Sequence, residues 1–208
     1  VGSVGRVGDE VKRLGKAGAF VVTDAGAVKA GLLQPVQESL HKAGITVEVF
    51  DQVQADPSGG IIEEGVRRFA ADPGRAIIGL GGGSSMDSAK AIGARATNPG
   101  HILDYRRGGK RIMNATPPII AIPTTAGTGS EVTPVAMVTD TESHTKVAII
   151  SGQLYVRLAL LDPALTRTLP PSVTAATGMD AMTHAVEAYT SSGANPITDA
   201  LAIGAIKM

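Results

Sequence analysis

The feature that most constrains the fold is a glycine-rich turn at residues 79–90, Gly-Leu-Gly-Gly-Gly-Ser-Ser-Met-Asp-Ser-Ala-Lys. The apolar run 76–78 before it predicts a buried strand, and the Ala-rich segment after it predicts a helix. Glycines at such a turn let backbone amides approach an anion, and the helix start adds a positive end. The turn therefore favours phosphate binding. The alternative is a capped helix start, with Ser84 as the N-cap and Asp87 as its acidic partner, because the strict G-x-G-x-x-G pattern fails at Ser84.

The rest of the chain alternates between strand and helix patterns as far as residue 163. This alternation predicts an α/β fold, a Rossmann-like parallel sheet with helices on both faces. From Pro170 onward only helical spacing remains. We expect a dinucleotide-binding domain over residues 1–165 and the start of an all-helical domain over 166–208. The expected strands are 19–23, 46–50, 76–78, 118–122 and 158–161, with a hairpin at 135–139 and 146–150; the expected helices are 3–14, 32–43, 60–71 and 85–96.

Two polar features follow buried strands and should meet the glycine turn at the carboxyl edge of the sheet. Asp24 ends the first strand, where a carboxylate can accept hydrogen bonds from a ribose. A helix N-cap or a turn is the alternative interpretation of Asp24. The loop 123–133, Pro-Thr-Thr-Ala-Gly-Thr-Gly-Ser-Glu-Val-Thr, offers small hydroxyls and free amides that suit phosphate, ribose or a carboxamide.

Composition excludes several classes of protein. The 19 basic and 19 acidic residues give zero formal net charge, which argues against a nucleic-acid partner. No apolar run is long enough to span a bilayer, so we expect no membrane association and a cytoplasmic location. The absence of Cys leaves His, Asp and Glu as the metal ligands available. The chain begins with Val1 and stops inside a helical pattern, so we expect it to be a piece of a longer protein.

Asp180 and His184 lie four residues apart in the helical pattern after Pro170. This spacing places both side chains on one helix face, where they can bind one divalent ion. The alternative is a hydrogen bond between the two side chains that braces the helix. No third ligand is obvious among His41, His101 and His144.

Three motifs in order resemble the iron-containing (group III) alcohol dehydrogenase family. They are Gly81-Gly-Gly-Ser-Ser-x-Asp-x-Ala-Lys90, Pro123-Thr-Thr-Ala-Gly-Thr-Gly-Ser-Glu-Val-Thr133 and Gly178-x-Asp-Ala-x-Thr-His-Ala-x-Glu187. The resemblance covers the family's N-terminal dinucleotide-binding domain and the first part of its helical domain. It implies an oxidoreductase that transfers a hydride between NAD and a small alcohol or aldehyde, assisted by a divalent metal.

The resemblance also implies the role of each site residue. Asp180 and His184 match the first two of the family's four metal ligands, for Fe²⁺ or Zn²⁺; the other two, both His, come from beyond the position of Met208. A homodimer or higher homo-oligomer is implied as well. The alternatives are a maleylacetate reductase, a hydroxyacid–oxoacid transhydrogenase or a non-catalytic nucleotide-binding fragment. The implied cofactor-binding residues are Asp24, Gly82, Gly83, Ser84, Asp87, Thr124, Thr125, Thr128, Met137, Lys146 and Leu165.

Overall fold

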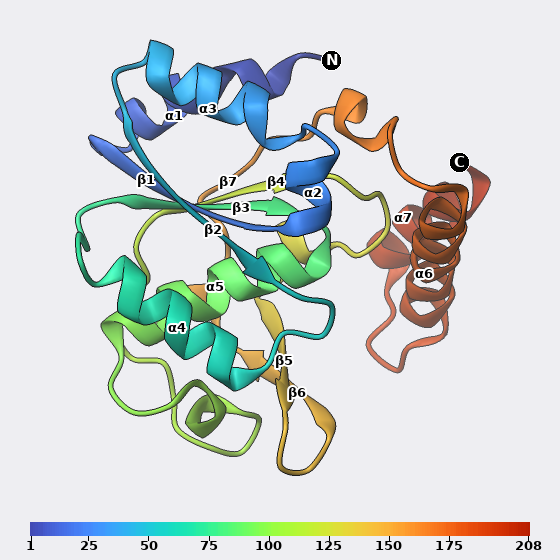
Figure 1. The fold of residues 1–208 in the computed structure, drawn as a ribbon. Coiled ribbons are helices and arrows are strands. Elements are labelled where there is room, and N and C mark those ends of the chain that lie inside the picture. Colours follow the sequence, from blue (N-terminus) through green and yellow to red (C-terminus); the bar gives the residue numbers. More distant parts are fainter.

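A computed structural model describes residues 1–208 and contains a five-stranded parallel sheet (Figure 1). The strand order is β2-β1-β3-β4-β7, and every neighbouring pair runs parallel. The chain thus crosses over between strands, which requires helices on the faces of the sheet. The strands are β1 (Gly18–Asp24), β2 (Thr46–Val53), β3 (Ala76–Gly81), β4 (Ile119–Pro123) and β7 (Leu158–Ala159).

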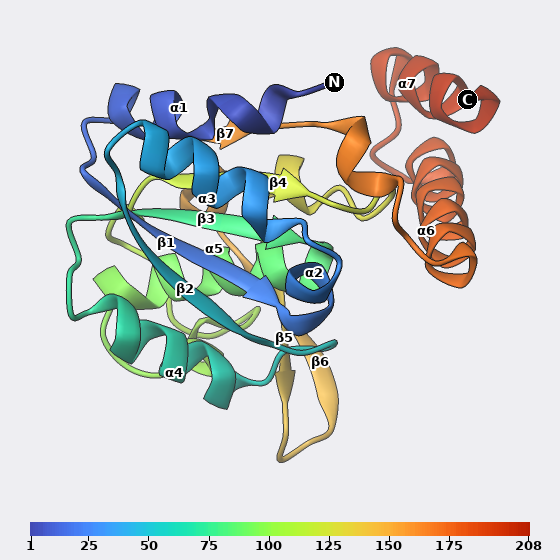
Figure 2. The same cartoon turned by 45° about the horizontal axis from the view of Figure 1, so that its top comes forward.

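Helices cover both faces of the sheet, as Figures 1 and 2 show. Helices α1 (Val7–Arg13) and α3 (Leu33–Lys42) lie on one face, and α4 (Gly59–Phe69) and α5 (Gly83–Thr97) lie on the other. Successive side chains of a strand point to opposite faces, so Phe20 and Val22 pack in one core cluster while Ala19 and Val21 pack in the other. The expected α/β fold with helices on both faces is confirmed.

Smaller elements complete the fold. The predicted hairpin is present as the antiparallel pair β5 (Val135–Asp140) and β6 (Thr145–Ile150). The sequence reading missed a short helix, α2 (Ala25–Lys29), and it made β7 too long by two residues. The 3₁₀ segments are Ser3–Arg6, Ile102–Tyr105, Ser130–Val132, Gly152–Leu154 and Pro163–Thr166.

The last two helices, α6 (Pro171–Thr190) and α7 (Pro196–Lys207), pack on each other beside the sheet (Figure 2). They bury little apolar surface, because only Ala185 and Ala202 are buried in them. No helix in the structure is long and apolar enough to cross a membrane. The exposed apolar side chains of α6 and α7 include Met179, Met182, Val186, Tyr189, Ile197, Leu201 and Ile206.

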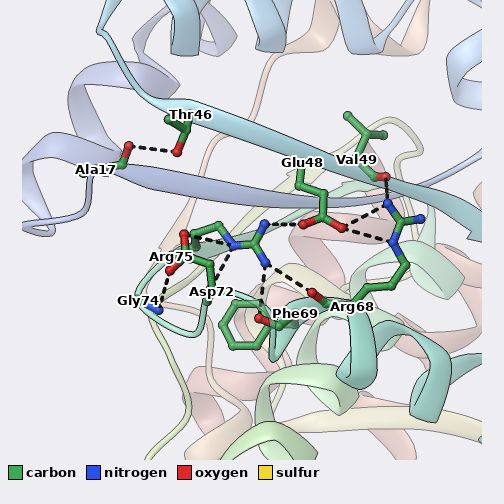
Figure 3. A network of polar contacts seen from close by, with 9 residues as sticks. All are labelled: Ala17, Thr46, Glu48, Val49, Arg68, Phe69, Asp72, Gly74 and Arg75. Atoms are coloured by element: carbon green, nitrogen blue, oxygen red, sulfur yellow. Dashed lines mark hydrogen bonds and ion pairs between the residues drawn. The ribbon is translucent and has the colours of Figure 1, made fainter.

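An ionic network of Glu48, Arg68 and Arg75 lies near the amino ends of the strands (Figure 3). Arg75 is 5% exposed, donates to Glu48 Oε2 and lies over the rings of Phe20 and Phe69. Arg68 also donates to Glu48, at 3.0 Å from Oε1. Burial alone would raise the pKa of Glu48, but the hydrogen bonds from Arg75 and Arg68 outweigh it and lower the pKa below its ordinary value.

We predict that Glu48→Gln lowers the free energy of unfolding by about 1–3 kcal/mol at pH 7, because the buried Arg75 loses the carboxylate of Glu48 and keeps only the more distant one of Asp72, at 3.7 Å. A lowered pKa means that the carboxylate stabilises the fold above its unfolded pKa and that this contribution is lost as the pH falls through the folded value. The difference between the two proteins should therefore shrink below about pH 4.5. Urea unfolding at pH 7 and pH 3.5 measures both effects.

Glu10→Gln is the matched control, because Glu10 pairs with Arg6 and Arg13, whose side chains are exposed. Ion pairs whose Arg partner is exposed in this way contribute about 0–1 kcal/mol. An equal loss in both variants would show that the network adds no stability of its own.

Candidate functional site

The glycine turn connects β3 to α5 at the carboxyl edge of the sheet. Gly82 has an extended backbone and is the N-cap, so α5 begins at Gly83. The interpretation of Ser84 as the N-cap is wrong, since Ser84 already lies in the first turn and no side chain caps this helix. Gly81 has φ +143°, and a Cβ there would lie 2.5 Å from Ser85 Oγ. The amides of the first turn are thus left free of any side-chain cap, as an anion site requires.

Asp87 does not close a capping box but joins α5 to the threonine-rich loop. Its Oδ1 accepts a hydrogen bond from the Ser130 hydroxyl, and its Oδ2 accepts one from the Met137 backbone amide at 3.0 Å. The Lys90 ammonium lies 3.1 Å from Oδ1. Both carboxylate oxygens are therefore occupied within the protein.

Lys90 is completely buried, and its ammonium donates to backbone carbonyls of the same loop and of the start of β5. The acceptors are the carbonyls of Ser130, at 2.9 Å, and Val135. Burial lowers the pKa of Lys90, while the neighbouring carboxylate of Asp87 opposes this shift. A buried charge needs such a complete set of partners, so the position of the loop is fixed by Lys90.

Asp24 lies beside the glycine turn, as the parallel sheet predicts. Its Oδ1 accepts from the Ala27 amide at 2.9 Å, and its Oδ2 accepts from the Ser85 hydroxyl at 3.0 Å. The alternative interpretation of Asp24 as a helix N-cap is thus confirmed, because it caps α2. A carboxylate can accept further hydrogen bonds, so binding of a ribose stays a prediction.

One cavity of about 780 Å³ brings the three motifs together. Gly83 and Ser84 from the turn, Thr128 from the loop and both proposed metal ligands line it. Thr139 also lines this cavity, and its hydroxyl has no hydrogen-bond partner within the protein. A polar ligand fits this arrangement. The sixteen lining residues are Asp56, Pro57, Gly83, Ser84, Asp87, Gly127, Thr128, Gly129, Ser130, Thr133, Val135, Met137, Thr139, Lys146, Asp180 and His184.

Five predicted cofactor-binding residues do not line this cavity: Asp24, Gly82, Thr124, Thr125 and Leu165. Thr125 is still close, because its Oγ1 would lie 3.6 Å from a Cβ on Gly82, and this hydroxyl also has no partner. Leu165 is 5% exposed and packs in the core beneath α1 and α3. The side chain of Leu165 therefore contributes to the hydrophobic core.

Sequence reasoning missed Asp56 as a site residue. The sequence 56–58, Asp-Pro-Ser, before a helical pattern is typical of a helix cap, but only Ser58 caps α4, by accepting from the Ile61 amide. Asp56 instead has φ +56° and forms an ion pair with Lys146 at 2.5 Å on the wall of the cavity. The Asp-Pro pair that follows a strand is the feature of the sequence that could have indicated a site residue at Asp56.

Asp180 and His184 lie one turn apart on α6, with 3.7 Å between Oδ1 and Nε2. This separation is too long for the bracing hydrogen bond that was the alternative interpretation. It suits a divalent ion placed between the two atoms, and carboxylate and imidazole are chemically appropriate ligands. No group of three or more His, Asp or Glu side chains in the structure is arranged to hold a metal ion, and a metal site at this pair stays a prediction.

Comparison with known proteins identifies the class of fold and then the family. A family model described as iron-containing alcohol dehydrogenase matches residues 1–163, and one for the C-terminal part of that family matches residues 174–208. A crystal structure of sulfoacetaldehyde reductase from Bifidobacterium kashiwanohense in complex with NAD⁺ superposes with a TM-score of 0.91 at 33% identity, covering 98% of this chain and 54% of that one. The chain therefore belongs to the iron-containing alcohol dehydrogenase family.

Curated relatives agree with this assignment. Choline dehydrogenase of Bacillus subtilis is 46% identical over the whole of this chain and 52% of the relative. NAD-dependent methanol dehydrogenase of Bacillus methanolicus is 42% identical over the whole of this chain and 54% of the relative. The chain thus spans about half the length of the curated relatives it matches.

We predict that Lys90→Met lowers the free energy of unfolding by about 3–5 kcal/mol, because Asp87 and the loop carbonyls lose a buried partner. Chemical denaturation measures the loss, and hydrogen exchange should show faster exchange of the amides at residues 127–130. Lys12→Met, at an exposed position of α1, is the control and should change stability by no more than about 0.5 kcal/mol. Equal effects of the two substitutions would contradict the role given to Lys90.

Proposed function

We propose that this chain is the coenzyme-binding part of an NAD-dependent, metal-requiring alcohol dehydrogenase that acts on a small alcohol or aldehyde. The observation that carries the proposal is the shared cavity, which is lined by the glycine turn, the threonine-rich loop and the pair Asp180 and His184. A hydride donor and its acceptor must be held in contact, and one cavity lined by both kinds of group allows this.

In this proposal the glycine turn binds the pyrophosphate of NAD. The free amides of the first turn of α5 and the positive end of the helix stabilise the negative charge. Lys146 adds a cation at the same cavity, and Asp56 holds its ammonium there. Met137, Thr124, Thr125 and Thr128 are proposed contacts to the remainder of the coenzyme.

Asp24 is proposed to accept hydrogen bonds from the adenosine ribose. A carboxylate at this position would repel a 2′-phosphate, so it favours NAD over the 2′-phosphorylated coenzyme. Its hydrogen bond from Ser85 keeps the carboxylate beside the glycine turn.

Asp180 and His184 are the residues that would hold the metal, Fe²⁺ or Zn²⁺, with the remaining ligands supplied from outside this chain. Bound there, such an ion supplies Lewis-acid polarisation of the substrate oxygen. Both side chains are about half exposed and line the cavity, so a substrate can reach them.

Several broader properties belong to the proposal as well. They are the division into residues 1–165 and 166–208, assembly as a homo-oligomer and a cytoplasmic location. The exposed apolar side chains of α6 and α7 support burial of these helices against further protein. The reductase, transhydrogenase and non-catalytic alternatives stay hypotheses. The Asp180–His184 pair favours the metal-dependent alcohol dehydrogenase over these alternatives.

We predict that NAD⁺ binds to this chain and that Asp24→Ser reduces its preference for NAD⁺ over NADP⁺ by about tenfold or more. Serine can still cap α2, so the substitution removes the charge while it retains the N-cap. Isothermal titration calorimetry with each coenzyme measures the two affinities.

Asp9→Ser, in the first turn of α1, is the control for loss of one negative charge and should leave the preference unchanged. An unchanged preference in Asp24→Ser would remove Asp24 from the site. Failure of the unmodified chain to bind either coenzyme would contradict the proposed function.

A further inference from the structure

We propose that the backbone carbonyl of Gly127 is a positioning group for His184, and that it couples the coenzyme-binding loop to the metal-ligand pair. This inference rests on the proposed function. It adds a direct contact between the threonine-rich loop and α6, which both line the cavity.

The first observation is the close approach of the loop to α6. Gly127 has φ +149°, and a Cβ at this position would lie 2.0 Å from the carbonyl oxygen of Thr177. Any other residue would clash with the helix backbone and would also be strained. Gly127 therefore allows the loop to contact α6 one turn before Asp180.

The second observation concerns the two nitrogens of His184. Nδ1 lies 3.4 Å from the Gly127 carbonyl oxygen, which can only accept a hydrogen bond. Nε2 lies 3.7 Å from Asp180 Oδ1, beyond hydrogen-bond distance. A proton on Nδ1 can therefore be donated to the Gly127 carbonyl, which leaves Nε2, the nitrogen nearer Asp180, without a proton.

This arrangement prepares the pair for a cation. With the proton on Nδ1, Nε2 and the Asp180 carboxylate can both donate electron pairs to one cation placed between them. A backbone carbonyl that accepts from the far nitrogen of a metal-binding His is a common way to fix its tautomer and orientation. Gly127 would have this role toward His184.

The third observation is that the same loop contacts the glycine turn on its other side. A Cβ on Gly83 would lie 3.3 Å from Thr128 Cβ, and Lys90 and Asp87 contact Ser130, two residues further along the loop. A dinucleotide bound at the turn would therefore contact a loop that also contacts His184. Because coupling between two binding sites is reciprocal, occupation of one should be sensed at the other.

The direct test is the tautomer of His184 in the chain without metal or coenzyme. Nitrogen-15 NMR of labelled histidine at about pH 8.5, where histidine side chains are in general neutral, distinguishes protonation at Nδ1 from protonation at Nε2. His184→Gln identifies the His184 signals among those of the four histidines. We expect the proton on Nδ1; a proton on Nε2 would overturn the proposal.

Gly127→Ala should move the loop away from α6 and abolish this preference for Nδ1. Gly178→Ala is the matched control, because Gly178 lies on α6 with open space around its Cβ position, and it should leave the His184 signals unchanged. A loss of the preference in both variants, or in neither, would overturn the proposal. The unmodified chain provides the test even if Gly127→Ala does not fold.

Coupling is tested by adding NAD⁺ to the same labelled chain. The His184 signals should shift along the binding curve measured by calorimetry, and the shift should be absent in Gly127→Ala. Binding of NAD⁺ without a shift would overturn the coupling. Failure of NAD⁺ to bind would instead contradict the proposed function, while the tautomer result would still decide the role of Gly127.

Discussion

The buried ammonium of Lys90 is the interaction on which the site depends. It lies inside the protein with the Asp87 carboxylate and the loop carbonyls as partners. Because an unpaired charge in the interior is very costly, the loop cannot leave these contacts without a large loss of stability. The loop that follows β4 is consequently held against the start of α5. Its glycines remain available to approach both a ligand and α6, so rigidity and access are combined in one segment.

The two ends of the sheet differ in composition: an ionic network lies at the amino ends of the strands, and the proposed binding site lies at the carboxyl ends. Near the amino ends of the strands, Arg75 and Glu48 form an ionic network over the rings of Phe20 and Phe69. At the carboxyl ends, β3 continues into the glycine turn, whose amides have no side-chain cap, and β4 continues into the threonine-rich loop, where the Thr125 hydroxyl has no partner. In parallel α/β sheets ligands bind at this second end, because the helices that follow the strands direct their amino termini there. The Arg75–Glu48 network thus lies away from the binding edge, where Lys90 and Asp87 hold the loop instead.

Much of the fold was predictable, because alternating apolar strands and amphipathic helices leave few arrangements other than a covered parallel sheet. The meeting of Asp24 with the glycine turn followed from the same logic. Contacts that depend on the tertiary path of a loop were not predictable: the alternative interpretation of Asp87 was the acidic partner of a capping box, but Asp87 binds Ser130, forty-three residues away. Leu165 matched a family position yet packs in the core. Asp56 was missed because its partner, Lys146, lies on a distant hairpin strand.

The central claim is that the glycine turn and the threonine-rich loop form one coenzyme site. It is tested most directly by mapping backbone amide NMR shifts while NAD⁺ is added to the chain. The predicted result is a set of saturable shifts at residues 82–84 and 127–129, with none at Gly59 and Gly60, which begin the other long helix on the same face of the sheet. Shifts confined to one of the two segments, or equally large shifts at Gly59 and Gly60, would contradict the claim.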